Sequence, residues 1–322
     1  MSRPSEPGGT AAIVGTGLVG RAWAIAFARA GWQVRLWDPD PGAPASALAT
    51  IDGLLADLAA QDMLGGAASA AVRARMAPAA GLAEALAGAD WVQENAPEDL
   101  AVKQALWGEL DVHADPGAIL ASSTSAIVPS RFTEPLAGRA RCLVCHPINP
   151  PYLIPAVELV PAPWTAPATM DRAEMVMRGL GQAPIVMRRE LDGFVMNRMQ
   201  GALLEEAFRL VADGYCTTED IDTGLKDGLA LRWSFMGPFE TIDLNAPGGV
   251  RDYATRYQQI YERLFPSMQR RVDWAGPVLD RVEQERRARL PIASLPDRHR
   301  WRDRRLMALL RHKRNAAREI GS

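Results

Sequence analysis

The chain has 322 residues, of which 48% are hydrophobic and 23% charged, and its formal net charge is −2. This length predicts two domains, and the nearly balanced charge gives the whole molecule no electrostatic reason to bind nucleic acid or an anionic membrane. The stretch Met1–Thr10 is polar and lacks the apolar core of a signal peptide, and no later run is expected to span a membrane, so we expect a cytoplasmic protein.

The first predicted elements form a dinucleotide site. An apolar strand ends at Val14, a glycine-rich turn follows, and a helix then begins whose first N–H groups would face a pyrophosphate. A second strand, Gln33–Trp37, leads to Asp38, a carboxylate that suits a ribose 2′-OH and repels a 2′-phosphate. This order of elements predicts NAD as the cofactor. The residues expected to contact it are Gly15, Gly17, Leu18, Val19, Gly20 and Asp38.

Strands and helices alternate through the following part of the chain. An alanine-rich helical region, Ala45–Leu86, comes first, and the alternation then continues to Arg188. From Asp192 the periodicity is helical almost to the end. We therefore expect a Rossmann-type doubly wound α/β sheet over residues 1–190 and an all-α domain over residues 191–322. The other expected elements are the strands Trp91–Glu94, Ala118–Ala121, Arg141–Cys145, Ala156–Val160 and Ile185–Arg188, and the helices Leu100–Leu110 and Met170–Leu180.

Thirteen basic residues lie between Arg281 and Arg318. Acidic residues are interspersed with them, and Trp301, Leu306 and Leu310 supply an apolar side, which favours a packed helix. An anion-binding tail is the alternative interpretation of this run.

The three cysteines are too few for a disulfide framework. The segment Cys142–His146 matches a haem-attachment pattern, but it lies in an apolar run that predicts a buried strand, and haem attachment of this kind requires export. We therefore expect neither haem nor a metal ion.

His146 is the candidate acid–base residue. It follows a predicted strand, at the edge of the sheet where open α/β folds bind ligands. The proline-rich loop Pro147–Pro155 is short enough for the returning strand to bring Glu158 beside His146, where a carboxylate would fix the imidazole tautomer. A structural histidine at a strand end is the alternative.

Two further polar positions are candidates. Asn197 lies on an otherwise apolar helical stripe, so its amide either bonds backbone or points at a ligand; the stripe comprises Phe194, Asn197, Gly201, Leu204, Phe208 and Val211. The cluster Ser122–Ser125 follows a predicted strand, where hydroxyl groups cap a helix or contact a ligand.

Together these motifs resemble the L-3-hydroxyacyl-CoA dehydrogenase superfamily, and most closely its branch of lambda-crystallins and L-gulonate 3-dehydrogenases. Segments that carry the resemblance in order are Gly15–Gly20, Glu94–Lys103, Ser122–Ser125, His146–Pro151, Val157–Val160, Gly193–Arg198 and Met236–Glu240. The resemblance implies an NAD-dependent oxidoreductase with its active site between the two domains and a homodimer formed through the helical domain.

The resemblance also implies roles for individual residues. His146 would be the general base, oriented by Glu158, and Ser125 and Asn197 would hydrogen-bond the substrate oxygen. Glu98, Lys103, Ser125 and Asn149 would lie along the cofactor.

Two departures from the acyl-CoA enzymes bear on the substrate. The stretch Ala56–Gly81 has no lysine, only Arg73 and Arg75, where those enzymes carry a lysine-bearing hairpin that meets CoA, and the C-terminus resembles the lambda-crystallin branch. Arg232 is the candidate for binding a substrate carboxylate, with an interface arginine as the alternative. We expect oxidation of the 3-hydroxyl of a small free hydroxy acid such as L-gulonate. A short-chain 3-hydroxyacyl-CoA dehydrogenase and a crystallin-like NADH-binding protein without activity are the alternatives.

Overall fold

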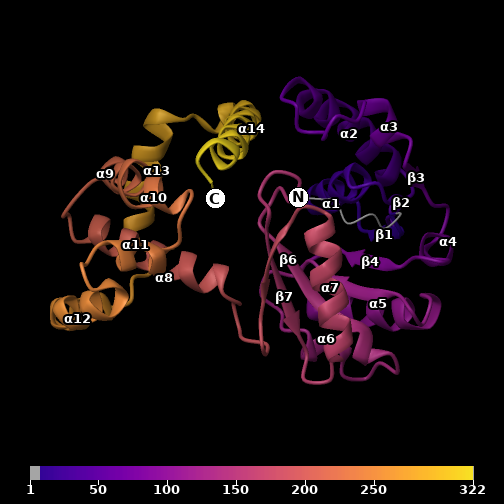
Figure 1. Ribbon diagram of the computed structural model, residues 1–322, viewed down its shortest axis with the longest axis horizontal. Coiled ribbons are helices and arrows are strands. Elements are labelled where there is room, and N and C mark those ends of the chain that lie inside the picture. Colours follow the sequence, from indigo (N-terminus) through magenta and orange to yellow (C-terminus); the bar gives the residue numbers. More distant parts are fainter. Residues whose placement is uncertain (1–7, 322) are drawn as a thin grey trace. The chain divides into compact units, whose positions relative to one another are not determined.

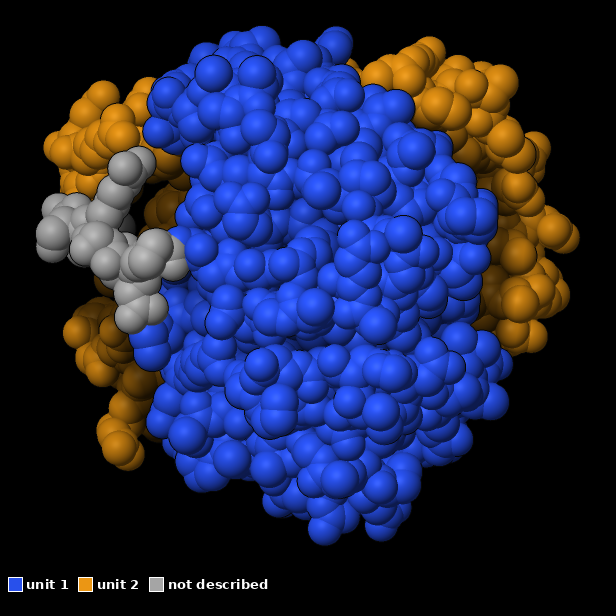
Figure 2. All heavy atoms as spheres, turned by 90° about the vertical axis from the view of Figure 1, so that its right-hand side faces the viewer, with its two compact units in different colours: residues 1–197, 303–311 blue, residues 198–302, 312–322 orange. Residues whose placement is uncertain are grey.

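The structure is a computed structural model that describes residues 8–321, so the polar stretch Met1–Pro7 lies outside the described part. The chain forms two compact units (Figure 2). The first runs to Asn197 and also includes Asp303–Arg311, and the second comprises Arg198–Arg302 and the residues after Arg311. The sequence places the boundary slightly earlier, between residues 190 and 191, and assigns the whole C-terminal part to one domain.

The first unit is built on an eight-stranded sheet in the order β3-β2-β1-β4-β5-β6-β7-β8 (Figure 1). All neighbouring strands are parallel except β6 and β7, which are antiparallel. The strands are β1 Thr10–Val14, β2 Gln33–Trp37, β3 Met76–Pro78, β4 Trp91–Glu94, β5 Ile119–Ser122, β6 Cys142–Pro147, β7 Ala156–Pro161 and β8 Ala183–Val186. The Rossmann-type sheet expected from the sequence is therefore present.

Strand β3 was not expected, because the sequence predicts a helical region over Ala45–Leu86, broken at Gly65–Gly66 and at Pro78 but without a strand. Its three residues pair in parallel with β2 at the edge of the sheet. Pro78 is compatible with this place because an edge strand has one side that needs no N–H donor. A strand this short has too few residues to show a periodicity.

Alternate residues of the central strands pack into two apolar cores on opposite faces of the sheet. In β1, Ile13 belongs to one core and Val14 to the other, as the two-residue period of a strand requires. The helices α1, α2 and α7 contribute to the first core, and α4, α5 and α6 to the second. The helices of this unit are α1 Leu18–Arg29, α2 Ala43–Ala60, α3 Ser69–Arg73, α4 Leu82–Leu86, α5 Leu100–His113, α6 Ser130–Thr133 and α7 Pro167–Gly179.

Helix α2 bears on the expectation that no run of the sequence could span a membrane. By length and composition alone it is apolar enough to cross a membrane. One of its faces is nevertheless buried in the core of the first unit, through Ala47, Leu48, Ile51, Leu55 and Leu58. Alanines on its other face, rather than a lipid-facing surface of large side chains, account for the apolar composition.

The second unit is helical, as the sequence predicts. Its elements are α8 Met196–Ala212, which begins in the first unit, α9 Thr218–Thr223, a π-helical segment Gly224–Leu229, α10 Ala230–Trp233, α11 Pro238–Leu244, α12 Gly249–Met268, α13 Pro277–Arg289 and α14 Leu295–Ile320.

The basic run Arg281–Arg318 includes a helical stretch of α14 that packs against the first unit. In α14, Met307 is buried, and Leu306 and Leu310 pack against the first core. Arg304 lies 3.3 Å from Asp57 of α2. In α13, Arg286 and Arg289 form ion pairs with acids of α9. Much of the positive charge is therefore neutralised within the chain.

Candidate active site

The glycine turn after β1 has the close approaches that a dinucleotide site needs. Gly15 adopts φ +88°, and a Cβ there would lie 2.9 Å from the carbonyl oxygen of Asn95. A Cβ on Gly20 would overlap the carbonyl oxygen of Gly15, so α1 packs directly against the turn. Gly17 has no heavy atom within 4 Å of its Cβ position. The turn is thus closed toward the protein and open above Gly17.

The N-terminus of α1 opens onto this space. Gly17 is the N-cap and provides no side-chain acceptor for the first N–H groups of the helix. Exposed N–H groups beside an open glycine suit a pyrophosphate, because they donate hydrogen bonds and carry the positive end of the helix dipole. The residues present therefore fit the phosphates of NAD.

Asp38 lies immediately after β2, beside the turn. Its Oδ2 accepts from the N–H and the hydroxyl of Thr16, at 2.7 and 3.1 Å, and its Oδ1 accepts from the N–H of Asp40 at 3.1 Å. These bonds fix the carboxylate at the carboxyl edge of the sheet. Its remaining lone pairs can accept from ribose hydroxyls.

The contact expected between Lys103 and the cofactor stays a prediction, and the buried position of this side chain does not favour it. The Lys103 side chain is 1% exposed and forms an ion pair with the fully buried Glu94, with Nζ 2.9 Å from Oε1 and 3.2 Å from Oε2. Glu94 also accepts from the N–H of Ala96, the indole of Trp107 and the hydroxyl of Ser122. Lys103 therefore stabilises the loop after β4 through its buried ion pair with Glu94.

Glu98 shapes the loop that carries Ser125. Its Oε1 accepts from the N–H groups of Ser125 and Ala126, at 3.2 and 3.0 Å, and from the hydroxyl of Thr124. Glu98 and Ser125 are both exposed. A contact of either side chain with the cofactor stays a prediction.

His146 and Glu158 face each other across the antiparallel pair β6 and β7. Nδ1 of His146 lies 2.7 Å from Oε2 of Glu158, and the two residues are 7% and 0% exposed. The ring of Phe194 lies 5.5 Å from the imidazole, centroid to centroid. The reversal of the chain after His146 thus produces the pairing that the sequence predicts.

Glu158 also holds the start of α8. Its Oε1 accepts from the N–H groups of Val195 and Met196, at 2.6 and 2.9 Å. One residue further on, Nδ2 of Asn197 donates to the carbonyl oxygen of Ser125 at 2.6 Å. These contacts bring four of the predicted residues, Ser125, His146, Glu158 and Asn197, into one connected set.

The apolar helical stripe predicted around Asn197 is only partly present in the structure. Phe194 precedes α8 and adopts φ +50°, so it does not share a helix face with the later members. Leu204 is 38% exposed. The amide of Asn197 nevertheless finds a backbone partner, as one of the two interpretations requires.

Two further predicted residues have different surroundings. Oδ1 of Asn149, in the loop between β6 and β7, is buried and has no hydrogen-bond partner among the described residues, as would suit an atom that meets a ligand. Arg232, on α10, contacts Asn245 at 3.5 Å within the second unit. Its contact with a substrate stays a prediction.

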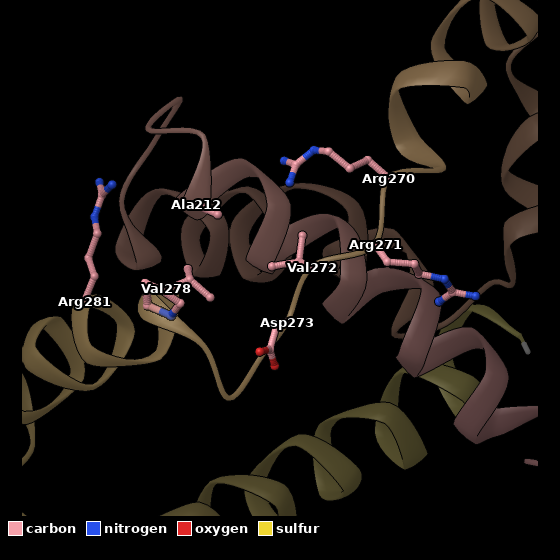
Figure 3. Close-up of a pocket in the computed structure, with 8 residues that line it drawn as sticks. Ala212, Arg270, Arg271, Val272, Asp273, Val278 and Arg281 are labelled. Carbon is pink, nitrogen blue, oxygen red and sulfur yellow. The ribbon is translucent and has the colours of Figure 1, made fainter.

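A hollow of about 300 Å³ in the second unit is a poor candidate for the site (Figure 3). Its arginine side chains point away from one another. Arg270 is paired with Asp213, and Arg281 with Glu285. The residues that line it are Ala212, Arg270, Arg271, Val272, Asp273, Pro277, Val278 and Arg281.

Comparison with known proteins agrees with this geometry. The model of the 3-hydroxyacyl-CoA dehydrogenase NAD-binding domain matches residues 10–191, and that of the C-terminal domain of the same family matches residues 193–277. Lambda-crystallin of Oryctolagus cuniculus is 40% identical over 313 residues, which cover 96% of this chain and 98% of the relative. L-carnitine dehydrogenase of a Pseudomonas species is 34% identical over 302 residues, covering 94% and 92%.

A solved structure extends the likeness to the whole fold. An NAD+-dependent dismutase, FHMPC 5-dehydrogenase, superposes with a TM-score of 0.80 at 28% identity, and the match covers 94% of this chain and 97% of that one. With both family models matched in order and the glycine turn fitted to the dinucleotide, the chain belongs to the 3-hydroxyacyl-CoA dehydrogenase family, and its cofactor is NAD.

Proposed function

We propose that this protein oxidises the 3-hydroxyl group of a small free hydroxy acid, of the L-gulonate kind, to the 3-oxo acid. The observation that carries the proposal is the buried, hydrogen-bonded pair of His146 and Glu158, at the same edge of the sheet as the glycine turn. An alcohol oxidised by hydride transfer must also lose a proton from its oxygen, and an imidazole backed by a carboxylate can accept that proton.

The hydrogen bonds of Glu158 define the role of each imidazole nitrogen. Two backbone N–H groups donate to Oε1, and Oε2 accepts from Nδ1 of His146. A proton held on Nδ1 leaves the lone pair of Nε2 to accept the hydroxyl proton of the substrate. The bound NAD supplies the acceptor for the hydride. Asn197 and the Ser125 hydroxyl would hydrogen-bond the substrate oxygen as its charge changes.

The two arginines of the α2–α3 region support a free acid over a CoA ester. Arg73 pairs with Asp52 at 3.0 Å and donates to the carbonyl oxygen of Met76. Arg75 donates to the carbonyl oxygens of Ala28 and Ala71. A CoA phosphate would have to displace these partners.

The last helix strengthens this argument. Its residues Leu306, Met307 and Leu310 pack against the core to which α2 belongs, and Arg304 pairs with Asp57 of α2. A pantetheine arm on this face of α2 would have to displace α14. Among the relatives, L-carnitine dehydrogenase is named for L-carnitine and not for a CoA ester. Arg232 is the side chain we assign to the carboxylate, since a guanidinium binds it with two hydrogen bonds.

Parallel assays of the purified protein with L-gulonate, L-carnitine and 3-hydroxybutyryl-CoA, with NADH absorbance as the readout, test the proposal. We expect one of the free acids to be the better substrate. A preference of about a hundredfold or more in kcat/KM for the CoA ester would replace the proposal by its first alternative, a short-chain 3-hydroxyacyl-CoA dehydrogenase. NADH binding without turnover of any hydroxy acid would favour a crystallin-like binding protein.

We also propose that the protein is a homodimer formed through α12. None of the twenty residues of this helix is buried, and it carries an apolar stripe at helical spacing. The stripe comprises Tyr257, Ile260, Tyr261, Leu264, Phe265 and Met268, each between 37% and 49% exposed. A second copy of the chain would supply the same stripe in return, as a two-fold interface requires.

Analytical sedimentation tests this interface. The variant Leu264→Asp should be monomeric, whereas Val112→Asp, at an exposed apolar position of α5, should remain dimeric. A monomeric wild-type protein would refute this proposal.

A further inference from the structure

Polar side chains connect the carboxyl ends of four neighbouring strands in the first unit. The strands β1, β4, β5 and β6 are adjacent in this order, and Ser123 directly follows β5. Its Oγ accepts from Nε1 of Trp23 at 3.0 Å and from Nε2 of Gln93 at 2.8 Å, and it donates to Oδ1 of Asn95 at 2.7 Å. A hydroxyl group has one proton and two lone pairs, so Ser123 is fully satisfied.

The donors in this network leave a single arrangement. The indole of Trp91 can only donate, and it lies 2.9 Å from Oε1 of Gln93. Nε2 of Gln93 therefore points at Ser123 and also donates to the carbonyl oxygen of Cys145 at 3.3 Å. Because two donors already occupy the lone pairs of Ser123, its proton goes to Asn95.

One end of the network lies at the glycine turn, and the other lies next to His146. At one end, Asn95 donates from Nδ2 to the carbonyl oxygen of Val14 at 3.3 Å, and its own carbonyl oxygen closes the space beside Gly15. At the other end, Cys145 is the residue before His146. The hydroxyl of Ser123 joins the side chains of Asn95 and Gln93, and Nδ2 of Asn95 also donates to the backbone carbonyl oxygen of Gln93 at 2.9 Å.

We propose that Ser123 is a positioning residue that fixes His146 relative to the glycine turn. It acts through Asn95 and Gln93, with no contact to the substrate. Hydride and proton leave neighbouring atoms of one alcohol, so the cofactor and the imidazole must be held in register, and a misplacement of about 1 Å can cost about a hundredfold in rate. The turnover readout for this inference rests on the proposed dehydrogenase function.

Ser123→Ala in the full-length protein tests the inference. We expect kcat to fall about 10- to 100-fold, while the Kd for NADH, measured by fluorescence titration, changes less than about threefold. NADH binding persists because the turn keeps its backbone bonds, from Gly15 to Trp37 and from Asn95 to Val14. Ser123→Thr retains the hydroxyl and should restore kcat to within about threefold of the wild type.

Thr133→Val is the matched control. The Thr133 hydroxyl is also buried, accepts from the indole of Trp164 at 3.0 Å and donates to a carbonyl oxygen, but it lies on α6, outside the network. We expect this variant to lose stability without losing kcat. An equal loss of kcat in both variants would overturn the inference, as would unchanged kcat in Ser123→Ala or a loss confined to NADH affinity.

Hydrogen–deuterium exchange provides a readout without substrate. In Ser123→Ala, the amides around Asn95 and those around His146 should exchange faster together, and in Thr133→Val neither segment should change. Unchanged exchange in both segments of Ser123→Ala would overturn the inference. If the wild type oxidises none of the assayed compounds, the proposed function fails, and this exchange experiment still decides the role of Ser123.

Discussion

Replacing Lys103 by methionine tests whether this lysine supports the fold or contacts the cofactor. The side chain is 1% exposed and its ammonium bonds both oxygens of the fully buried Glu94. Methionine fills much of the same volume but leaves the carboxylate with three neutral donors, Ala96, Trp107 and Ser122. Removal of one partner from a buried ion pair destabilises a protein by about 3–5 kcal/mol. For a unit of this size, 1 kcal/mol corresponds to about 2–4 °C, so Tm should fall by about 6–20 °C.

Thermal unfolding followed by circular dichroism measures this effect, and NADH titration at low temperature measures cofactor binding in the same variant. We expect the Kd for NADH to change by less than about threefold, because the side chain lies beneath the loop after β4. The double variant Glu94→Gln/Lys103→Met removes the stranded charge and should recover more than half of the lost Tm. A small change in Tm together with a large rise in Kd would show that Lys103 faces the cofactor and does not mainly support the fold.

Two further predictions concern the glycine turn and the cysteines. Gly15→Ala should abolish NADH binding, because φ +88° and the nearby carbonyl oxygen of Asn95 exclude a Cβ. Gly53→Ala, on the exposed side of α2, should retain NADH binding and stabilise the protein by about 0.5–1 kcal/mol. NADH titration and thermal unfolding of both variants check these outcomes. Iodoacetamide at pH 8 should label Cys216 in the native protein but not Cys142 or Cys145. Burial raises the pKa of Cys142 to about 12 and the pKa of Cys145 well above its ordinary value, so little of the reactive thiolate is present. Labelling of Cys142 or Cys145, detected by peptide mass spectrometry, would contradict this prediction.

The order of elements could be predicted from the sequence because local patterns determine it. The apolar run before Gly15, the glycine spacing and the acid after β2 are all readable within one short stretch, and the structure contains each of them. The pairing of His146 with Glu158 was predictable too, since a short loop between two strands forces them to be neighbours. Strand β3 escaped prediction because three residues at a sheet edge have no periodicity.

Contacts between distant segments could not be predicted in the same way. Lys103 occupies a position that the family resemblance assigns to the cofactor, and only the packing of α5 on β4 shows that its ammonium meets Glu94. Gln93 did give a signal, an amide within the apolar strand Trp91–Glu94, but its partners are Ser123, just after β5, and Cys145 of β6. The covering of α2 by α14 is likewise a contact between the two ends of the chain.

The most direct test of the central claim is the turnover of His146→Gln, measured through NADH formation beside an NADH titration of the same variant. General acid–base catalysis is worth about 10²–10⁴ in rate, so we expect kcat to fall by that factor while the Kd for NADH stays within about threefold of the wild type. A variant that oxidises its substrate at the wild-type rate would contradict the account, because the proton would then leave the alcohol without the imidazole.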